Sequence, residues 1–270
     1  MANRIHMAVA LAGAVAVGIL VGLRPQFDSF GAAPSGAREF SHGYLSAQAA
    51  AGINLPPPPA AGSHEIQRDE ESRKVSLQAR TGPRYALAMA DSDRSQAGSV
   101  RSFRCAFGMN IDTKETPKLF ALLSRLRYDV RSTAYRLKSR YQRERPFVAE
   151  HGRACSQRED QLRASGSYPS AGSAVGWAYA LVLSAVNPQR RDALRRRGFD
   201  YGQSRLVCDA EWQSDVDAGR NVASEAVRQM QANAQFRQDL AAARDEVAQL
   251  LASGHQSPMD CTLENQLAAR

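Results

Sequence analysis

The sequence lacks several features that would indicate particular kinds of protein. Its 4 cysteines show no pair at the spacing of zinc ligands, which argues against a structural metal site. Alternation of apolar and polar residues at a period of two is almost absent, and so is any internal repeat. Aromatic residues make up 7% of the chain and do not interleave with basic ones, so nucleic-acid binding is not indicated despite a formal net charge of +8. The positive charge suits anionic small ligands better.

A long apolar run is found only at the N-terminus. It extends from Met7 to Leu23, after Arg4, and Arg24 follows it. A basic start followed by such a run predicts an export signal, and its length also allows an uncleaved anchor. We therefore expect residues 1–24 to be a signal peptide or anchor. The protein would then be periplasmic or secreted, or anchored to the inner membrane if the segment is not cleaved.

The rest of the chain divides by composition. Residues 25–100 form an arm rich in Pro, Ala and Gly, with one short helix expected in "RYALAMADSDRS". Residues 101–252 carry a succession of helical signals and predict one helical domain. Residues 253–270 are expected to be a C-terminal tail.

Helical periodicity in the 101–252 region predicts an all-α fold, a helical bundle. Thr116 and Pro117 together indicate the start of a long helix over 118–144, in which leucines recur at helical spacing. Further helices are expected to begin at Ser170 and at Asn187-Pro188, and to cover roughly 212–231 and 234–252.

Three short segments contain the residues that suit chemistry on an anion. In "KSRYQRERP", Lys138 stands seven residues before Arg145. In "YPSAGS", a helix is expected to start at Ser170, and "SRLVCDAEWQSD" contains Arg205 and Asp215. A lysine and an arginine seven apart usually form only a solvated helix face, so the segments are informative as a set.

In this order the segments resemble the three-part signature of the class A nonspecific acid phosphatases. These belong to the phosphatidic-acid-phosphatase type 2 superfamily, which also includes vanadium haloperoxidases. The family pattern is Lys, six residues, Arg-Pro; then Pro-Ser-Gly-His; then Ser-Arg, five residues, His, three residues, Asp. The segments "GWAYALVL", "NPQR" and "WQSDVDA" also resemble the family, so the resemblance covers about residues 44–250. The matching positions are Lys138, Arg145, Pro146, Pro169, Ser170, Ser204, Arg205 and Asp215.

The matched positions are suited to hold a phosphoryl group. Lysine and arginine would surround its oxygens with a point charge and planar forks, and a helix start would add a hydroxyl and N–H groups. The resemblance implies phosphate or small phosphomonoesters as ligands, vanadate as an analogue, and no metal or other cofactor. The implied phosphate-binding residues are Lys138, Arg145, Ser170, Ala171, Gly172 and Arg205.

Two positions depart from the family pattern. Gly172 stands where the resemblance would place the histidine that protonates the leaving alcohol, and Glu211 stands where it would place the nucleophilic histidine. In the family the following Asp orients that imidazole, so Asp215 has no ring left to orient. A carboxylate at 211 would also compete with an anion for the surrounding cations. The departures predict a phosphate- or phosphoester-binding protein with little or no hydrolysis.

Several alternatives stay open on the sequence alone. One is an active periplasmic acid phosphatase with altered chemistry, restricted to esters whose leaving groups need no proton. Others are Glu211 as a nucleophile, His151 as a displaced proton donor, a membrane-surface role for the basic cluster at 190–197, and a homo-oligomer. An acidic run could also hold a divalent ion; it comprises Asp209, Glu211, Asp215 and Asp217.

The resemblance also suggests how the cysteines pair. Cys155 falls in a loop expected near the pocket, and Cys208 lies three residues after Arg205, so we predict a bridge between them. The remaining pair is Cys105 with Cys261, near the two ends of the helical domain. Four cysteines allow three pairings, and the other two stay open.

Overall fold

The computed structural model describes residues 42–156 and 158–268. Within these ranges all regular secondary structure is helical and no strand is present, which confirms the all-α prediction. The elements in chain order are α1 (Ala47–Gly52), α2 (His64–Gln78), α3 (Gly82–Ala90), α4 (Gln96–Arg101), α5 (Arg104–Phe107), α6 (Pro117–Tyr141), α7 (Pro146–Ala149), α8 (Glu159–Arg163), α9 (Ala171–Val186), η1 (Pro188–Arg190), α10 (Arg191–Val207), α11 (Gln213–Met230), α12 (Ala234–Ala252) and α13 (Thr262–Ala268).

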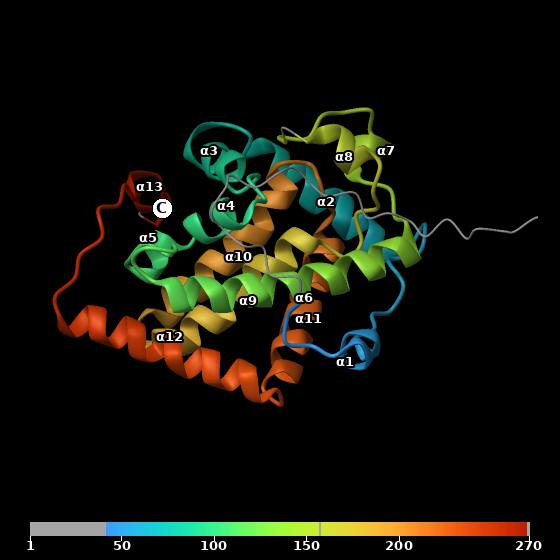
Figure 1. The fold of residues 1–270 in the computed structure, drawn as a ribbon. Helices are drawn as coiled ribbons and strands as arrows, with labels where there is room; N and C mark the ends of the chain where they lie inside the picture. The colour runs from blue at the N-terminus through green and yellow to red at the C-terminus, as the bar shows by residue number, and fades with distance from the viewer. Residues whose placement is uncertain (1–41, 157, 269–270) are drawn as a thin grey trace, which may run out of the picture. The chain divides into compact units, whose positions relative to one another are not determined.

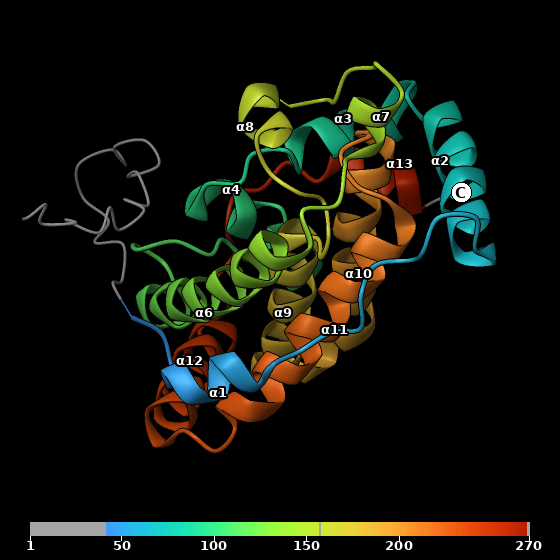
Figure 2. The same cartoon turned by 90° about the vertical axis from the view of Figure 1, so that its right-hand side faces the viewer.

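Helix α9 is the central helix of the bundle, and α6, α10 and α11 pack around it (Figures 1 and 2). Its sequence is apolar on nearly every side, as expected for a helix without a solvent-facing stripe. Helix α6 instead buries one face, and α12 lies along it (Figure 1). The predicted leucine stripe of α6 is in the core; its members are Leu119, Leu122, Leu123 and Leu126.

Two glycines allow α9 to approach its neighbours closely. A Cβ atom at Gly176 would lie 2.4 Å from the Tyr201 ring on α10. A Cβ atom at Gly219 on α11 would lie 2.4 Å from the carbonyl oxygen of Ser170. Neither distance is tolerable, so glycine is required at both positions. The second contact brings α11 against the start of α9, where the candidate site lies.

Helices α6 and α10 begin near where the sequence predicts, but without the expected side-chain caps. The Thr116 side chain does not cap α6; instead, the Glu246 carboxylate on α12 accepts from the N–H groups of Lys118 and Leu119, both at 3.0 Å. Asn187 likewise makes no side-chain cap, and η1 precedes α10. A carboxylate at a helix start is favoured by the unpaired N–H groups and the helix dipole. Glu246, which is distant in the sequence, therefore caps α6 in place of Thr116.

The region before residue 100 contains more helix than the sequence patterns indicate. Besides α3, which covers part of the expected patch, the structure has α1, α2 and α4. Helix α2 is polar almost throughout and its one buried residue is Asp69. It therefore lacks the apolar periodicity on which the prediction depends. Segment 1–24 lies outside the described residues, and the boundaries at 100 and 253 stay predictions.

The disulfides join the predicted cysteines. The Cα atoms of Cys105 and Cys261 lie 5.7 Å apart and those of Cys155 and Cys208 lie 4.7 Å apart. Both separations suit a bridge, so the predicted pairing is confirmed. The first bridge ties α5 to the segment before α13, and the second ties the loop before α8 to the end of α10.

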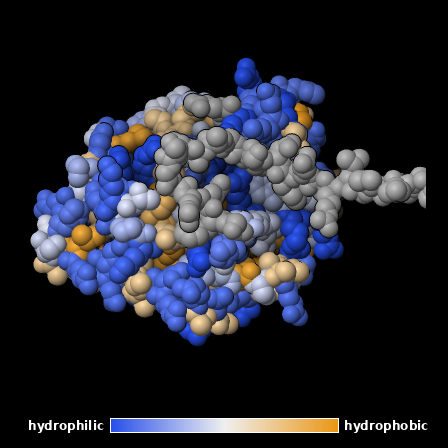
Figure 3. Space-filling view, in the orientation of Figure 1, coloured by the Kyte–Doolittle hydropathy of each residue, from blue (hydrophilic) through white to orange (hydrophobic). Residues whose placement is uncertain are grey.

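The surface of the described residues is mainly polar. On the face in Figure 3, hydrophobic residues lie in small separate groups among hydrophilic ones. Scattered groups of this kind are normal on a protein surface. None of the helices in the described part of the chain is both long and apolar enough to span a membrane.

Candidate functional site

We call the predicted phosphate-binding set the cradle; it comprises Lys138, Arg145, Ser170, Ala171, Gly172 and Arg205. Two of its cations, Lys138 and Arg145, meet the carboxylate of Glu211, between α10 and α11. Nη1 of Arg145 donates to Oε1 of Glu211 at 3.2 Å, and Nζ of Lys138 lies 3.6 Å from the same oxygen. All three side chains are at most 3% exposed. Lys138 is near the end of α6 and Arg145 directly precedes α7, so the fold brings separate segments onto one carboxylate oxygen.

Backbone carbonyl groups hold the two cations in place. Nζ of Lys138 donates to the carbonyl oxygens of Gly166 and Ser167 at 3.0 and 2.5 Å. The Arg145 guanidinium has a larger set of carbonyl acceptors at 2.8 to 2.9 Å, which are Leu162, Ser165, Gly166 and Ala210. These contacts fix both charges without a ligand, which is the preorganisation that a binding site requires.

Arg205 on α10 is equally buried but is less completely bonded. Its Nε and Nη2 atoms have no hydrogen-bond partner among the described residues, and neither has Oε2 of Glu211. Arg205 lies against Gly172, where an added Cβ would be 3.1 Å from its Cδ. Buried polar groups are nearly always bonded, so these donors of Arg205 are an exception within the described ranges.

Burial and charge together set the protonation of these groups. Burial lowers the pKa of Lys138 to about 7, although the negative charge of Glu211 raises it in part. Burial also lowers the pKa of Arg205, to about 10. Burial alone would raise the pKa of Glu211, but nearby positive charges outweigh it and lower this pKa to about 2; they belong to Lys138, Arg205, Arg145 and Arg94. Glu211 is therefore ionised at neutral pH.

The start of α9 joins the cradle to α11. Ser170 is the N-cap of α9: its hydroxyl accepts from the N–H of Ser173 at 3.0 Å, and its own N–H donates to the carbonyl oxygen of Asp215 at 2.8 Å. The first N–H groups of the helix, at Ala171 and Gly172, have no partner within the helix. The helix therefore adds partial positive charge to this end of the site.

Asp215 is held from two sides. Its Oδ1 accepts from Nη1 of Arg143 and its Oδ2 accepts from the N–H of Trp212, both at 2.7 Å. Burial raises the pKa of Asp215 to about 6, and Arg143 opposes this rise. Arg143 also pairs with Asp69 of α2 at 2.7 Å. Both oxygens of the Asp215 carboxylate are thus engaged by other groups.

Three residues at the site were not predicted. Arg143 lies inside the "KSRYQRERP" segment, so its place in the motif was a usable signal. No sequence signal pointed to Asp69 or Arg94, because Asp69 lies on the polar helix α2 and Arg94 lies in the polar segment before α4. Their approach depends on tertiary packing.

The other candidate groups do not join the cradle. His151 is exposed on the loop after α7, and no hydrogen bond or ion pair links it to the cradle in the described ranges. Asp209 pairs with Arg73 at 2.7 Å, and Asp217 pairs with Arg220 at 2.5 Å. Within residues 42–156 and 158–268, no group of three or more His, Cys, Asp or Glu residues is placed to hold a metal ion.

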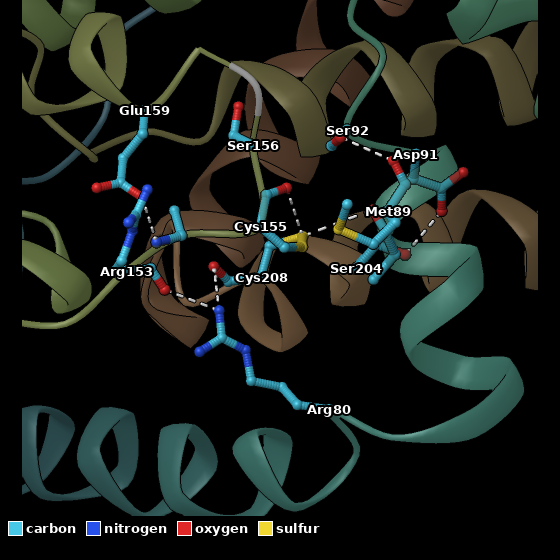
Figure 4. The surroundings of a disulfide bond; sticks show 12 residues. Arg80, Met89, Asp91, Ser92, Arg153, Cys155, Ser156, Glu159, Ser204 and Cys208 are labelled. Atoms are coloured by element: carbon cyan, nitrogen blue, oxygen red, sulfur yellow. Dashed lines mark hydrogen bonds and ion pairs between the residues drawn. A yellow bond between two sulfur atoms is a disulfide. The ribbon is translucent and has the colours of Figure 1, made fainter.

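The Cys155–Cys208 bridge anchors the end of α10 beside the site. Nη2 of Arg80 donates to the carbonyl oxygens of Arg153 and Cys208 at 2.8 and 3.3 Å (Figure 4). The N–H of Cys155 also donates to the carbonyl oxygen of Cys208 at 3.1 Å. The turn that leads from Arg205 to Glu211 is therefore tied to the loop that follows α7.

Comparison with known proteins shows which family the chain resembles over most of its length. The chain is 40% identical over 198 residues to a non-specific acid phosphatase of Providencia stuartii, which covers 73% of this chain and 80% of the relative. It is 34% identical over 219 residues to an acid phosphatase of Zymomonas mobilis, and the match covers 81% of this chain and 83% of the relative. It is 38% identical over 198 residues to a non-specific acid phosphatase of Salmonella typhimurium, and the match covers 72% of this chain and 78% of the relative. No protein-family profile matches the chain. At these identities and coverages, the chain belongs to the acid phosphatase family.

Proposed function

We propose that this acid phosphatase family member binds phosphate or small phosphoesters and hydrolyses them little or not at all. The observation that carries the proposal is the buried, ionised carboxylate of Glu211, which faces Lys138 and Arg145 at the family's nucleophile position. A carboxylate there occupies the cations that a phosphoryl group would need. It acts as an internal anion that any ligand must displace from them.

Electrostatics argues for weak binding. Two unit charges about 4 Å apart interact by about 4 kcal/mol at an effective dielectric constant of 20, so the competition from Glu211 is substantial. The unpartnered Nε and Nη2 atoms of Arg205 and the start of α9 still offer donors to an anion. The cradle therefore keeps affinity, but less than it would have around an imidazole.

The chemistry argues for little turnover. The resemblance assigns nucleophilic attack and protonation of the leaving group to imidazoles, and Glu211 and Gly172 stand at those positions. Removing a nucleophile that acts with its partners typically costs roughly 10³ to 10⁶ in rate. We propose phosphomonoesters as the ligand class from the names of the relatives, vanadate as an analogue, and the periplasm or the exterior as the location from segment 1–24.

A second candidate function is slow hydrolysis with Glu211 as the nucleophile. The observation that favours it is that Oε2 of Glu211 is buried and has no hydrogen-bond partner among the described residues. Oε2 would attack phosphorus and release the alcohol, and water would then cleave the acyl phosphate to phosphate and the carboxylate. Gly172 provides no proton, so only leaving groups that are stable as anions would depart.

One experiment separates the two functions. The purified native protein and its Glu211→Gln variant are assayed with p-nitrophenyl phosphate from pH 4 to 8, and phosphate binding is measured by calorimetry. We expect negligible turnover by both proteins, and about tenfold or tighter phosphate binding by Glu211→Gln, because a competing charge is removed. Glu225→Gln, on the exposed face of α11, is the matched control and should leave binding unchanged.

Turnover by the native protein that disappears in Glu211→Gln would establish the second function. Robust turnover that survives in Glu211→Gln would overturn both, because another group would then be the nucleophile. Absence of phosphate binding in both proteins would overturn the binding proposal.

A further inference from the structure

A proline-rich segment joins α1 to α2 and contacts residues that flank the cradle. It covers residues 53–63, with prolines at 56–59, and is drawn in blue between the two helices in Figure 2. The hydroxyl of Tyr141 donates to the carbonyl oxygen of Leu55 at 2.6 Å, and the hydroxyl of Tyr168 donates to that of Pro56 at 2.9 Å. Consecutive prolines have no N–H to donate, so the segment depends on donors from the rest of the fold.

The two tyrosines connect this segment to two parts of the cradle. Tyr141 lies three residues after Lys138 at the end of α6, and Tyr168 lies two residues before Ser170. Their rings pack edge to face, with centroids 5.3 Å apart. Burial raises the pKa of Tyr168 to about 12, so at neutral pH its hydroxyl keeps the proton that it donates. The segment therefore links the end of α6 to the start of α9.

Helix α2, which follows directly, contacts the site through Asp69. Its Oδ2 accepts from Nη2 of Arg143 at 2.7 Å and from the hydroxyl of Ser214 at 2.6 Å, and its Oδ1 accepts from the N–H of Ser214 at 2.8 Å. Arg143 lies two residues before Arg145, and Ser214 directly precedes Asp215. The Asp69 carboxylate is buried and accepts three hydrogen bonds, so it holds both neighbours in place.

Arg73, one turn after Asp69 on α2, adds a contact near Glu211. Its guanidinium donates to both carboxylate oxygens of Asp209 at 2.7 and 2.9 Å, and Asp209 lies two residues before Glu211. We call residues 53–73 the supporting segment. It contacts all three signature segments, and each contacted residue lies within three positions of a cradle residue, Glu211 or Asp215.

We propose that the supporting segment holds the three signature segments in the relative positions that anion binding requires, with Tyr141, Tyr168 and Asp69 as positioning residues. This inference rests on the proposed binding function. The cradle residues come from helix ends and loops, and such sites need fixed surroundings to keep their geometry. The positioning residues act through their neighbours in the chain, so their loss should weaken binding without removing any group that the cradle supplies.

Asp69 gives a sharp test because its charge and its position predict opposite effects. On charge alone, Asp69→Asn should tighten anion binding, since it removes a negative charge close to the site. Whichever way the new amide is oriented, its nitrogen faces a donor of Arg143 or Ser214, so these residues should shift. We therefore expect Asp69→Asn to weaken orthophosphate binding by about fivefold or more. Asp129→Asn is the matched control and should leave binding unchanged, because this buried carboxylate on α6 also accepts from backbone N–H groups.

The main test is calorimetry with orthophosphate on the full chain. We expect the double variant Tyr141→Phe/Tyr168→Phe to bind about tenfold less tightly than the native protein, because two carbonyl groups lose their donors while both rings stay. Tyr44→Phe is the matched control, since it removes a hydroxyl that donates to Oδ2 of Asp239 on α12 at 2.7 Å. This control should keep the affinity within about twofold of the native value.

Hydrogen exchange gives a second measurement that needs no ligand. The N–H of Ser167 donates to the carbonyl oxygen of Arg143, and that of Ser170 donates to the carbonyl oxygen of Asp215, both at 2.8 Å. In the double variant we expect these two N–H groups to exchange at least about tenfold faster, with no change in α12. General destabilisation would instead speed exchange in α12 as well.

The outcomes separate this inference from the binding function. Unchanged orthophosphate affinity in the double variant, tighter binding by Asp69→Asn, or an equal loss in Tyr44→Phe would overturn the positioning role and leave the cradle intact. Absence of orthophosphate binding by the native protein would overturn the proposed function, and the exchange rates of Ser167 and Ser170 would then decide the positioning role. Weaker binding in the double variant and in Asp69→Asn, with faster exchange confined to the site, would establish it.

Discussion

Arg197 and Arg205 lie eight residues apart on α10, and both are almost fully buried, yet their surroundings differ. Arg197 donates to both carboxylate oxygens of Asp91, and its Nε donates to the carbonyl oxygen of Ser102 at 2.7 Å. Arg205 leaves Nε and Nη2 without partners in the described part of the chain. Burial lowers the pKa of Arg197, but Asp91 more than offsets this, whereas the pKa of Arg205 falls to about 10. Arg197 is paired within the fold, whereas the proposed binding function assigns the remaining donors of Arg205 to a ligand.

The largest expected effect tests this contrast through stability. Arg197→Met should lower the free energy of unfolding by about 3–5 kcal/mol, because it leaves the buried Asp91 without its partner. Arg205→Met should lower it by less, about 1–2 kcal/mol, since Nε and Nη2 of Arg205 make no hydrogen bond among the described residues and Lys138 and Arg145 still face Glu211. Urea denaturation of both variants measures the difference. Equal losses would show that Arg205 is as structural as Arg197.

The next effect concerns chemistry at the cradle. Glu211→His removes the competing carboxylate and returns an imidazole beside Asp215, so we expect p-nitrophenyl phosphate turnover at least about 100-fold above the native protein. Glu211→Gln is the control, and should stay inactive. Failure of Glu211→His to gain activity, with orthophosphate binding intact, would indicate that Arg143 and Trp212 hold Asp215 too firmly to orient a ring.

Adding Gly172→His should help less than the family pattern suggests. A Cβ there would lie 3.1 Å from Cδ of Arg205, so Arg205 must move to admit the imidazole. We expect the double variant to act on alkyl phosphates, whose leaving groups need a proton, while its orthophosphate affinity falls below that of Glu211→His. Alkyl phosphate assays and calorimetry check both parts. Alkyl phosphate turnover by Glu211→His alone would show that another group supplies the proton.

A smaller effect is a pH dependence from Lys138. Its pKa of about 7 in the folded protein means that its positive charge is lost as pH rises through 7. Sulfate, which stays dianionic over this range, should therefore bind about tenfold less tightly at pH 8.5 than at pH 6. Lys138→Arg should flatten this profile, because a guanidinium remains charged. A profile that falls equally in both proteins would assign the titration elsewhere.

The smallest effect is expected at an exposed ion pair on α11. Arg228 and Glu225 bond closely, but Arg228 is 71% exposed. Arg228→Ala should change the free energy of unfolding by less than about 0.5 kcal/mol, because water screens such pairs. Urea denaturation of Arg228→Ala, run in parallel with Arg197→Met, measures the two changes in the free energy of unfolding on the same scale. A loss above about 2 kcal/mol would mean that ion-pair burial does not govern these energies.

The parts of the structure that follow local rules were predictable from the sequence. Helices α6, α11 and α12 follow from apolar periodicity, α9 follows from its start signal at Ser170, and the cysteine pairs follow from the resemblance. Helix α2 was not predictable, since it is polar and is held by distant ion pairs of Asp69 and Arg73. The same reason explains the Glu246 cap on α6 and the approach of Arg94, because contacts across more than 100 residues leave no local pattern.

The Cys105–Cys261 disulfide gives the domain a closed covalent topology. The bridge joins positions 156 residues apart, and the Cys155–Cys208 bridge is nested inside it. Every residue of the cradle lies within the outer ring, while Arg94 lies outside it. A single peptide-bond cleavage anywhere in the ring would leave one covalently connected molecule, so the segments that bind an anion would stay tethered. Separating them would require both cleavage and reduction.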